Sequence, residues 1–364
     1  MIHFINRLYS TVKNVLSSND SPYKELKIKS LEREKRIHNS QNNKYKDANY
    51  SIAYNLFEKG NEKFSNEDYE GAIIEYNRSL EIHPILEDAY HNRGCSYARL
   101  ENHEKAIEDY SRNLLINPKD ENSYFNRAYS KNQINDKEGA LVDYSKVISL
   151  NNEDKVAYFN RALIFYELTL FTKAQFDLNR AIELDENYYD AHFYKALIKT
   201  ENKELQEALN DYDIAEKIYS KDPYLYYNRG IIYSDMKKYN KAISEYDKAI
   251  SIDKNHSLSY NNRAYIYIKQ GYYNKAIKDC DDAININPNF AFAYNNRGFS
   301  KYKLGLYLDA LKDCTQSKSL DESNAHVYYY LGLIFHKLSE PEKSKIYLAK
   351  ADELGYNDDR ENIN

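Results

Sequence analysis

The side chains best suited to catalysis or metal binding are few and scattered in this sequence. Its 364 residues include nine histidines and three cysteines, Cys95, Cys280 and Cys314. The histidines show neither H-x-x-x-H spacing nor the Cys–His spacing that holds zinc, so we expect no metal site. Three cysteines are too few for a disulfide framework, which favours a reducing, cytoplasmic compartment. We interpret each histidine as a surface or packing residue, and Cys280 and Cys314 as small buried hydrophobic residues.

Motifs that bind nucleotides are missing as well. The sequence contains neither G-x-x-x-x-G-K-[ST] nor G-x-G-x-x-G, and its ten glycines all fall inside the repeats described below. No apolar run approaches the roughly 20 residues of a membrane-spanning helix. We therefore expect no cofactor and no catalytic activity in this chain.

A different kind of chemistry recurs along the chain: a basic residue is followed, sixteen positions later, by an acidic one. Successive pairs are 34 residues apart, and a copy beginning at Ala325 loses both charges together, having Leu331 and Tyr347. The joint loss favours a structural ion pair between two helices of one repeat. Independent solvated charges, or a row of arginines that binds an acidic ligand, are the alternatives. The predicted pairs are Arg93 with Asp109, Arg127 with Asp143, Arg161 with Asp177, Arg229 with Glu245, Arg263 with Asp279, and Arg297 with Asp313.

The elements that must position these charges are helices in a repeat of 34 residues. One helical stripe has a large residue at position 4 and Gly or Ala at position 8, and a second has Ala at position 20 and mostly Tyr at position 24. One such helix pair cannot bury both of its faces, so neighbouring pairs must stack into a solenoid. The register runs without insertion from Ala53 to Asp358, and the repeats are 53–86, 87–120, 121–154, 155–188, 189–222, 223–256, 257–290, 291–324 and 325–358.

Composition supports a thin-layered array. Apolar residues make up 42 % of the chain only because its 39 tyrosines are counted among them. Residues 1–52 carry a net charge of +5, and since the whole chain carries −5, the remainder carries −10. An acidic array is poorly suited to nucleic acid, because contacts with phosphate dominate such binding.

The period, the small residues at positions 8 and 20, and proline at position 32 (Pro84, Pro118, Pro288) resemble the tetratricopeptide repeat. Segments such as AYNNRGFSKYKLGLYLDALKDC, residues 293–314, are similar to the tyrosine-rich members of that family. The resemblance covers residues 53–358. It implies an all-α fold, a right-handed α–α superhelix of about nine helix-turn-helix repeats. We expect a partly helical N-terminal extension in front of it.

The resemblance also implies a binding surface, because positions 2, 5, 6, 9, 12 and 13 of the first helix line a concave groove in that family. Asparagine recurs at position 6, similar to the asparagine ladder of O-linked N-acetylglucosamine transferases, and a carboxamide could pair with the backbone of an extended peptide. The alternative is that these asparagines contact water or neighbouring helices. Position 5 is mostly aromatic, and position 13 becomes basic towards the C-terminus. The expected groove residues are Asn92, Asn126, Asn160, Asn228, Asn262 and Asn296, with Phe125, Phe159, Phe193, Tyr227, Lys269, Lys303 and Lys337.

The carboxylate clamp of heat-shock co-chaperones is a related pattern that the sequence does not match. Asn61 and Asn92 fit it, but Phe57, Asn122 and Asn126 do not. We therefore expect no binding to chaperone C-termini.

The chain has a basic N-terminal extension and a short C-terminal tail outside the repeats. Residues 1–19 have apolar side chains at near-helical spacing, which predicts a cap on the first repeat or, alternatively, a membrane-surface or targeting helix. We interpret residues 20–50 as a charged helix followed by a flexible linker, and 359–364 as a tail. The sequence thus favours a non-catalytic scaffold that binds a protein or an extended peptide in its groove. The alternative is a substrate-recruiting subunit of a separate enzyme.

Overall fold

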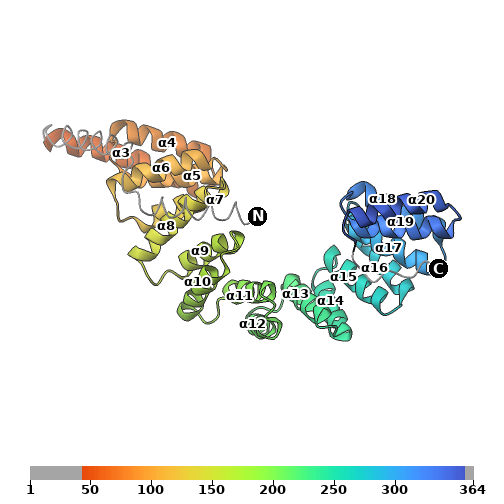
Figure 1. The fold of residues 1–364 in the computed structure, drawn as a ribbon. Coiled ribbons are helices and arrows are strands. Elements are labelled where there is room, and N and C mark those ends of the chain that lie inside the picture. The colour runs from red at the N-terminus through yellow and green to blue at the C-terminus, as the bar shows by residue number, and fades with distance from the viewer. Residues whose placement is uncertain (1–42, 357–364) are drawn as a thin grey trace. The chain divides into compact units, whose positions relative to one another are not determined.

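The structure, a computed structural model, describes residues 43–356, with side chains from Ala48 onwards. In this range it contains eighteen α-helices, which follow one another as nine antiparallel hairpins (Figure 1). The hairpins are α3(Asn43–Ser65) with α4(Tyr69–Ile82), α5(Glu87–Arg99) with α6(His103–Ile116), α7(Glu121–Gln133) with α8(Lys137–Leu150), α9(Lys155–Glu167) with α10(Phe171–Leu184), α11(Tyr189–Glu201) with α12(Leu205–Ile218), α13(Pro223–Asp235) with α14(Tyr239–Ile252), α15(Ser257–Lys269) with α16(Tyr273–Ile286), α17(Ala291–Lys303) with α18(Tyr307–Leu320), and α19(Ala325–Lys337) with α20(Pro341–Glu353).

The first helix is longer than the sequence predicts. It begins at Asn43, ten residues before the expected start of the first repeat at Ala53. The prediction of a flexible linker up to residue 50 is therefore wrong for residues 43–50, a segment that contains no proline or glycine to end a helix. The predictions for residues 1–19, 20–42 and 359–364 lie outside the described residues.

The core of a hairpin is a close approach of two helices around the side chain at position 24, which is a tyrosine ring in five of the nine repeats. Alanine at position 20 is fully buried, as in Ala72 and Ala242, and so is tyrosine at position 24, as in Tyr76 and Tyr246. The ring of Tyr246 needs the glycine at position 8, because a Cβ on Gly230 would lie 2.4 Å from it. The small residues that define the repeat thus make room for the buried tyrosines.

The turn between the two helices has the same backbone geometry in each of the nine described repeats. Residue 15 is left-handed, with φ between +57° and +78°. The following N–H donates to the carbonyl oxygen five residues earlier, as from Asn102 to Tyr97 at 2.9 Å. This is the Schellman ending of a helix, which favours glycine. Gly271 and Gly305 satisfy that preference, whereas Thr169 occupies the position as a β-branched residue.

The described part of the chain divides into two compact units, which are separated between Ala191 and His192. Within each unit the second helix of a hairpin contacts the first helix of the next, as α6 contacts α7 and α16 contacts α17. First helices also contact each other across successive repeats, as α5 and α7 do in the first unit and α15, α17 and α19 do in the second. In the described part of the chain no helix is long and apolar enough to cross a membrane.

The ninth repeat replaces the charged pair with an apolar cluster. Leu331 is 1 % exposed and belongs to the same hydrophobic cluster as Tyr347, the residue at the position of the missing acid. The Tyr347 ring stacks on Phe335 with 5.3 Å between centroids, and beyond α20 Tyr356 stacks on Tyr329 at 4.2 Å. The terminal repeat therefore holds its two helices by ring and aliphatic packing.

Candidate functional site

In five of the repeats the recurring arginine and aspartate form a bidentate ion pair between the two helices. Arg127 on α7 donates through Nε and Nη2 to both carboxylate oxygens of Asp143 on α8, at 2.8 and 2.7 Å. The side chain of Asp143 is only 2 % exposed, so its charge requires ion-pair partners. The same geometry joins Arg93 to Asp109, Arg161 to Asp177, Arg263 to Asp279 and Arg297 to Asp313.

The arginines also reach the preceding repeat, a contact that our reading of the sequence missed. The third nitrogen, Nη1, donates to a polar side chain at position 25 of that repeat, as from Arg93 to Asn77 at 2.6 Å and from Arg127 to Ser111 at 3.0 Å. The position-4 tyrosine of the same helix covers the guanidinium, with Arg93 5.4 Å from the centroid of Tyr90. Each arginine therefore joins the two helices of its repeat and the neighbouring repeat.

Burial disfavours the charged guanidinium of Arg93, but the hydrogen bonds and the negative charge of Asp109 outweigh burial and raise the pKa of the arginine. Burial also raises the pKa of Asp109, but both of its carboxylate oxygens accept hydrogen bonds from Arg93, so we interpret the pair as an ion pair with a structural role. The arginines are occupied by the protein's own acids, so they do not form a row for an acidic ligand.

One of the predicted pairs departs from this geometry. Arg229 lies 3.3 Å from Glu245, but it also contacts Glu216 and lies 3.3 Å from Asp213. The longer glutamate at position 23 and the extra acid on α12 distribute the contacts of this arginine over three carboxylates. In the first repeat Glu75 pairs with Arg78 of its own helix, at 2.8 Å.

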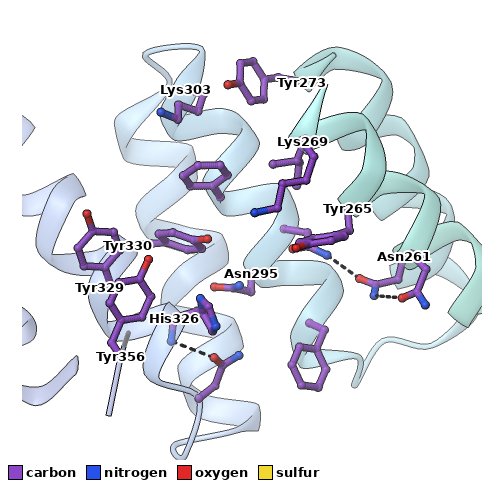
Figure 2. A pocket seen from close by; sticks show the side chains of 16 residues that line it. Asn261, Tyr265, Lys269, Tyr273, Asn295, Lys303, His326, Tyr329, Tyr330 and Tyr356 are labelled. Carbon is purple, nitrogen blue, oxygen red and sulfur yellow. Dashed lines mark hydrogen bonds between the residues drawn. The ribbon is translucent and has the colours of Figure 1, made fainter. Parts of the chain in front are cut away.

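In the second unit the first helices of the last three repeats enclose a hollow of about 560 Å³. Figure 2 shows Lys269 and Lys303 at one end and Tyr329, Tyr330 and Tyr356 along one side. Most of the lining residues stand at the positions that the family resemblance assigns to the groove. They are Asn261, Asn262, Tyr265, Ile268 and Lys269 of α15, Tyr273 of α16, Phe292, Asn295, Asn296, Phe299 and Lys303 of α17, His326, Tyr329 and Tyr330 of α19, and Asn324 and Tyr356 outside the helices.

The lysines of this hollow lie against aromatic rings. The ammonium group of Lys269 is 5.3 Å from the centroid of Tyr265, and that of Lys303 is 5.3 Å from the centroid of Phe299. Among the described residues that line the hollow there is no aspartate or glutamate. Lys337, the third lysine of the predicted row, is exposed but does not line the hollow. The site is therefore aromatic and positively charged.

The asparagine row makes contacts within the protein. Asn92 donates to Asn61 Oδ1 of the preceding repeat at 2.8 Å, and Asn296 donates to Asn261 Oδ1 at 3.0 Å. Asn160 instead donates to the backbone oxygen of Val156 in its own helix, at 2.8 Å. Each of these bonds uses one of the two amide hydrogens. The alternative that these asparagines contact neighbouring helices thus has direct support for Asn92 and Asn296, and Asn92 also has a side-chain hydrogen bond with Tyr76.

The aromatic residues at position 5 belong partly to the helix interface. Phe125 packs edge-on against the buried Tyr144, with 5.4 Å between centroids, and Phe193 packs in the same way on Tyr212 at 5.6 Å. Tyr227 lies 6.2 Å from the ring of Tyr246, and Phe159 5.2 Å from that of Tyr188. Of these four residues, Phe125 lines the hollow of the first unit, which is described next. None of the four lines the hollow of the second unit, whose aromatic wall comes from other residues.

The hollow of the first unit, of about 850 Å³, lies over α3, α5 and α7. It is lined by Phe125 and Asn126 of α7, and by Cys95 and Arg99 of α5. Asn126 Nδ2 approaches Cys95 Sγ at 3.6 Å. The sequence analysis did not single out Cys95. A signal was available, because His91 and Cys95 stand four residues apart on one helix and both occupy groove positions.

Comparison with protein families agrees with this architecture. Models described as tetratricopeptide repeat match residues 87–120, 223–256 and 257–290, residues 156–223, and residues 325–354. Together these matches cover more than half of the chain, which therefore belongs to the tetratricopeptide repeat family. It is an all-α helical-hairpin solenoid and, as a member of that family, a scaffold for protein–protein interaction.

Solved structures show the same fold at low sequence identity. One match is a chain in the crystal structure of the APC/C hetero-tetramer Cut9-Hcn1, with 13 % identity and a TM-score of 0.53. The match covers 84 % of this chain and 74 % of that one. The chain also matches Pseudomonas aeruginosa pilF, with 18 % identity, a TM-score of 0.51, and coverage of 56 % of this chain and 93 % of that one. PilW, described as a type IV pilus biogenesis factor, gives 18 % identity, a TM-score of 0.50, and coverage of 56 % and 95 %. No curated protein sequence gives a match to the chain.

Proposed function

We propose that this protein binds an extended acidic peptide with aromatic or other large apolar side chains, in the hollow formed by α15, α17 and α19. The observation that carries the proposal is the convergence of two lysines, two asparagines of the predicted ladder and a wall of aromatic rings on one surface. The protein itself performs no chemistry on the peptide in this account.

The positive charge of the hollow selects the charge of the ligand. Lys269 and Lys303 hold equivalent positions in successive repeats, and both rest against rings of the groove. Placing an ammonium group on a ring limits where the charge can go, which reduces the entropy lost when a carboxylate pairs with it. Two such groups favour a peptide with at least two acidic residues.

The aromatic wall supplies the apolar part of the binding energy. Tyr265 and Phe292 are 43 % and 53 % exposed, although both are large and apolar. The Phe299 ring stacks on Tyr330 with 4.5 Å between centroids, which makes a rigid surface between the two exposed rings and the C-terminal tyrosines. A large apolar side chain of the ligand would cover this surface and gain about 25 cal/mol for each Å² removed from water.

The backbone of the ligand would be held by amides. Asn296 has one amide hydrogen bonded to Asn261, so its second hydrogen and its carbonyl oxygen remain to pair with a peptide unit. Such pairing does not depend on the ligand's side chains. Specificity therefore comes from the lysines and the rings.

The proposal is tested by fluorescence anisotropy of the full chain with three labelled decapeptides, alternating Glu–Phe, Ser–Phe and Lys–Phe. The Glu–Phe peptide should bind most tightly, and the double variant Lys269→Glu with Lys303→Glu should weaken it at least tenfold. The matched control is Lys278→Glu with Lys312→Glu, which makes the same charge change at exposed positions of α16 and α18 outside the hollow, also 34 residues apart. The control should lose less than threefold. Equal binding of the three peptides, or equal losses in the two variants, would refute the proposal.

A further inference from the structure

A thiol, an imidazole and a carboxylate come together in the second repeat, beside the hollow of the first unit. His91 and Cys95 stand at positions 5 and 9 of α5, one helical turn apart. In the next repeat the same positions carry Phe125 and Tyr129. The second repeat thus places a base and a nucleophile where its neighbour has two aromatic rings.

Two donors point at the sulfur from other helices. Tyr110 on α6 donates its hydroxyl to Cys95 Sγ at 3.4 Å, and Asn126 on α7 donates an amide hydrogen at 3.6 Å. Hydrogen bonds to a charged form favour that form, so both donors stabilise a thiolate over a thiol. Burial raises the pKa of Tyr110 above its ordinary range, and hence that hydroxyl keeps its proton.

The imidazole is oriented by groups on its other side. His91 Nδ1 lies 2.7 Å from the hydroxyl of Ser123 and 3.6 Å from Asp120 Oδ2, and Asn113 donates to the same oxygen of Asp120 at 2.9 Å. Burial disfavours the charged imidazolium, but the hydrogen bonds with Asp120 and Cys95 outweigh burial and raise the pKa of His91 to about 10. The ring is therefore a cation at neutral pH.

The surroundings of the sulfur favour its charged form. Burial opposes the thiolate, but the hydrogen bond and the positive charge of His91 outweigh burial and lower the pKa of Cys95. Arg99, on the same helix, contributes in the same direction. The remaining ionisable groups that face the sulfur are two phenols, Tyr110 of α6 and Tyr76 of α4.

The other two cysteines provide an internal contrast. Cys280 and Cys314 are fully buried, and burial raises the pKa of each thiol above its ordinary range. A thiol in such surroundings is inert, because the thiolate is the reactive form. Cys95 is the partly exposed one of the three.

A reagent can reach the sulfur through the hollow. Cys95 lines it, together with Ser130, whose buried hydroxyl has no hydrogen-bond partner among the described residues. His103 also lines the hollow, and its buried Nδ1 likewise has no hydrogen-bond partner among the described residues. The volume of about 850 Å³ holds several water-sized molecules, and these two groups can bond to a small polar reagent.

We propose that Cys95 is a nucleophilic thiolate and the site at which this protein is oxidised by hydroperoxides. The sulfur attacks one oxygen of hydrogen peroxide, so that an S–O bond forms as the O–O bond breaks. The sulfur is oxidised by two electrons to a sulfenic acid, and the peroxide is reduced to hydroxide, which takes a proton from solvent. The imidazolium of His91 acts as a positioning residue that holds the thiolate charge.

The test uses the folded full chain and measures all three cysteines at once. Hydrogen peroxide is added with dimedone, which traps sulfenic acids, and each cysteine is quantified by peptide mass spectrometry. Cys95 should be labelled at least tenfold faster than Cys280 and Cys314. In urea, where the fold is lost, the three should react at similar rates. Labelling of Cys95 in the folded chain no faster than that of the two buried cysteines would overturn the proposal.

The pH dependence of alkylation distinguishes a Cys95 thiol with a lowered pKa from one that is only more exposed than the other two cysteines. The rate of alkylation by iodoacetamide should have its midpoint below about 8.5, the value of an unperturbed cysteine. His91→Gln, which retains a hydrogen-bonding side chain without the charge, should raise that midpoint and slow alkylation at pH 7 about fivefold or more. Tyr110→Phe keeps the packing and should give a smaller change in the same direction. A wild-type midpoint at or above 8.5 would overturn the proposal without recourse to any variant.

Discussion

Two ion pairs of the first unit differ in one residue, and this difference predicts unequal costs for the same mutation. Arg127 and Arg161 each bind a buried aspartate with two hydrogen bonds, and each donates to a serine of the preceding repeat, at 3.0 and 2.9 Å. Their side chains are 17 % and 16 % exposed. In the third repeat, however, Lys131 also contacts Asp143, at 2.7 Å, whereas the fourth repeat has Phe165 at that position.

Arg161→Ala should therefore be the more damaging change. Among the described residues Arg161 is the one cation within ion-pair distance of Asp177, whose side chain is 1 % exposed. Removing one partner of a buried pair costs about 3–5 kcal/mol, because the other charge is left buried and uncompensated. Arg127→Ala leaves Asp143 with Lys131, so its cost should be smaller by about 1.5–3 kcal/mol, the size of a hydrogen bond to a charged group.

The assay is urea unfolding followed by circular dichroism at 222 nm, with the midpoint and slope compared among variants. Arg127→Ala with Lys131→Ala should reach the cost of Arg161→Ala, because the last cation of the third repeat is then gone. Equal midpoints for the two single arginine variants would contradict this prediction. A smaller effect of Arg161→Ala would do so as well, since both results mean that Lys131 does not compensate for the loss of Arg127.

Three further predictions concern the backbone, the core and pH. Thr169→Gly should stabilise the chain by about 1 kcal/mol, because Thr169 has φ +57° and only glycine adopts that conformation without strain; an unchanged urea midpoint would contradict this. Gly230→Ala should destabilise by about 1–3 kcal/mol in the same assay, since the added Cβ would meet the Tyr246 ring at 2.4 Å; a tolerated substitution would mean that the ring can move. The pKa of His91 is raised to about 10 in the folded protein, so its contribution to stability is complete below about pH 6.5 and is lost as the pH rises through 10. The midpoint should therefore fall more steeply over that interval in the wild type than in His91→Gln. The pKa of Asp120 is lowered to about 2 against burial by its hydrogen bonds, so its contribution is present above about pH 3.8 and is lost only in strong acid.

The repeat could be predicted from the sequence because each repeat buries the same types of residue. A small residue recurs at position 8, as Gly230 does opposite the Tyr246 ring, since the two helices approach each other closely there. The pairing of Arg127 with Asp143 was also visible, because the ninth repeat loses both charges at once and fills the space with Leu331. In these cases a physical requirement leaves a repeated pattern.

Features that belong to a single repeat could not be found in this way. The contact of Cys95 with His91, Tyr110 and Asn126 occurs once, and its members come from three helices. The tyrosine is a standard residue of the repeat, so nothing in its sequence position marks it as a donor to sulfur. The left-handed residue of the turn was hidden for a related reason: Thr169 carries no signal, because the Schellman hydrogen bonds impose that conformation on whichever residue stands there.

If charge in the hollow of α15, α17 and α19 selects the peptide, reversing that charge should change which peptide binds. The full chain with Lys269→Glu and Lys303→Glu is titrated with the Glu–Phe and Lys–Phe decapeptides, and anisotropy gives both dissociation constants. The preference should invert, so that the variant binds Lys–Phe more tightly than Glu–Phe while the wild type does the opposite. If the variant instead keeps the wild-type preference, the peptide is held by another surface and the proposed site is wrong.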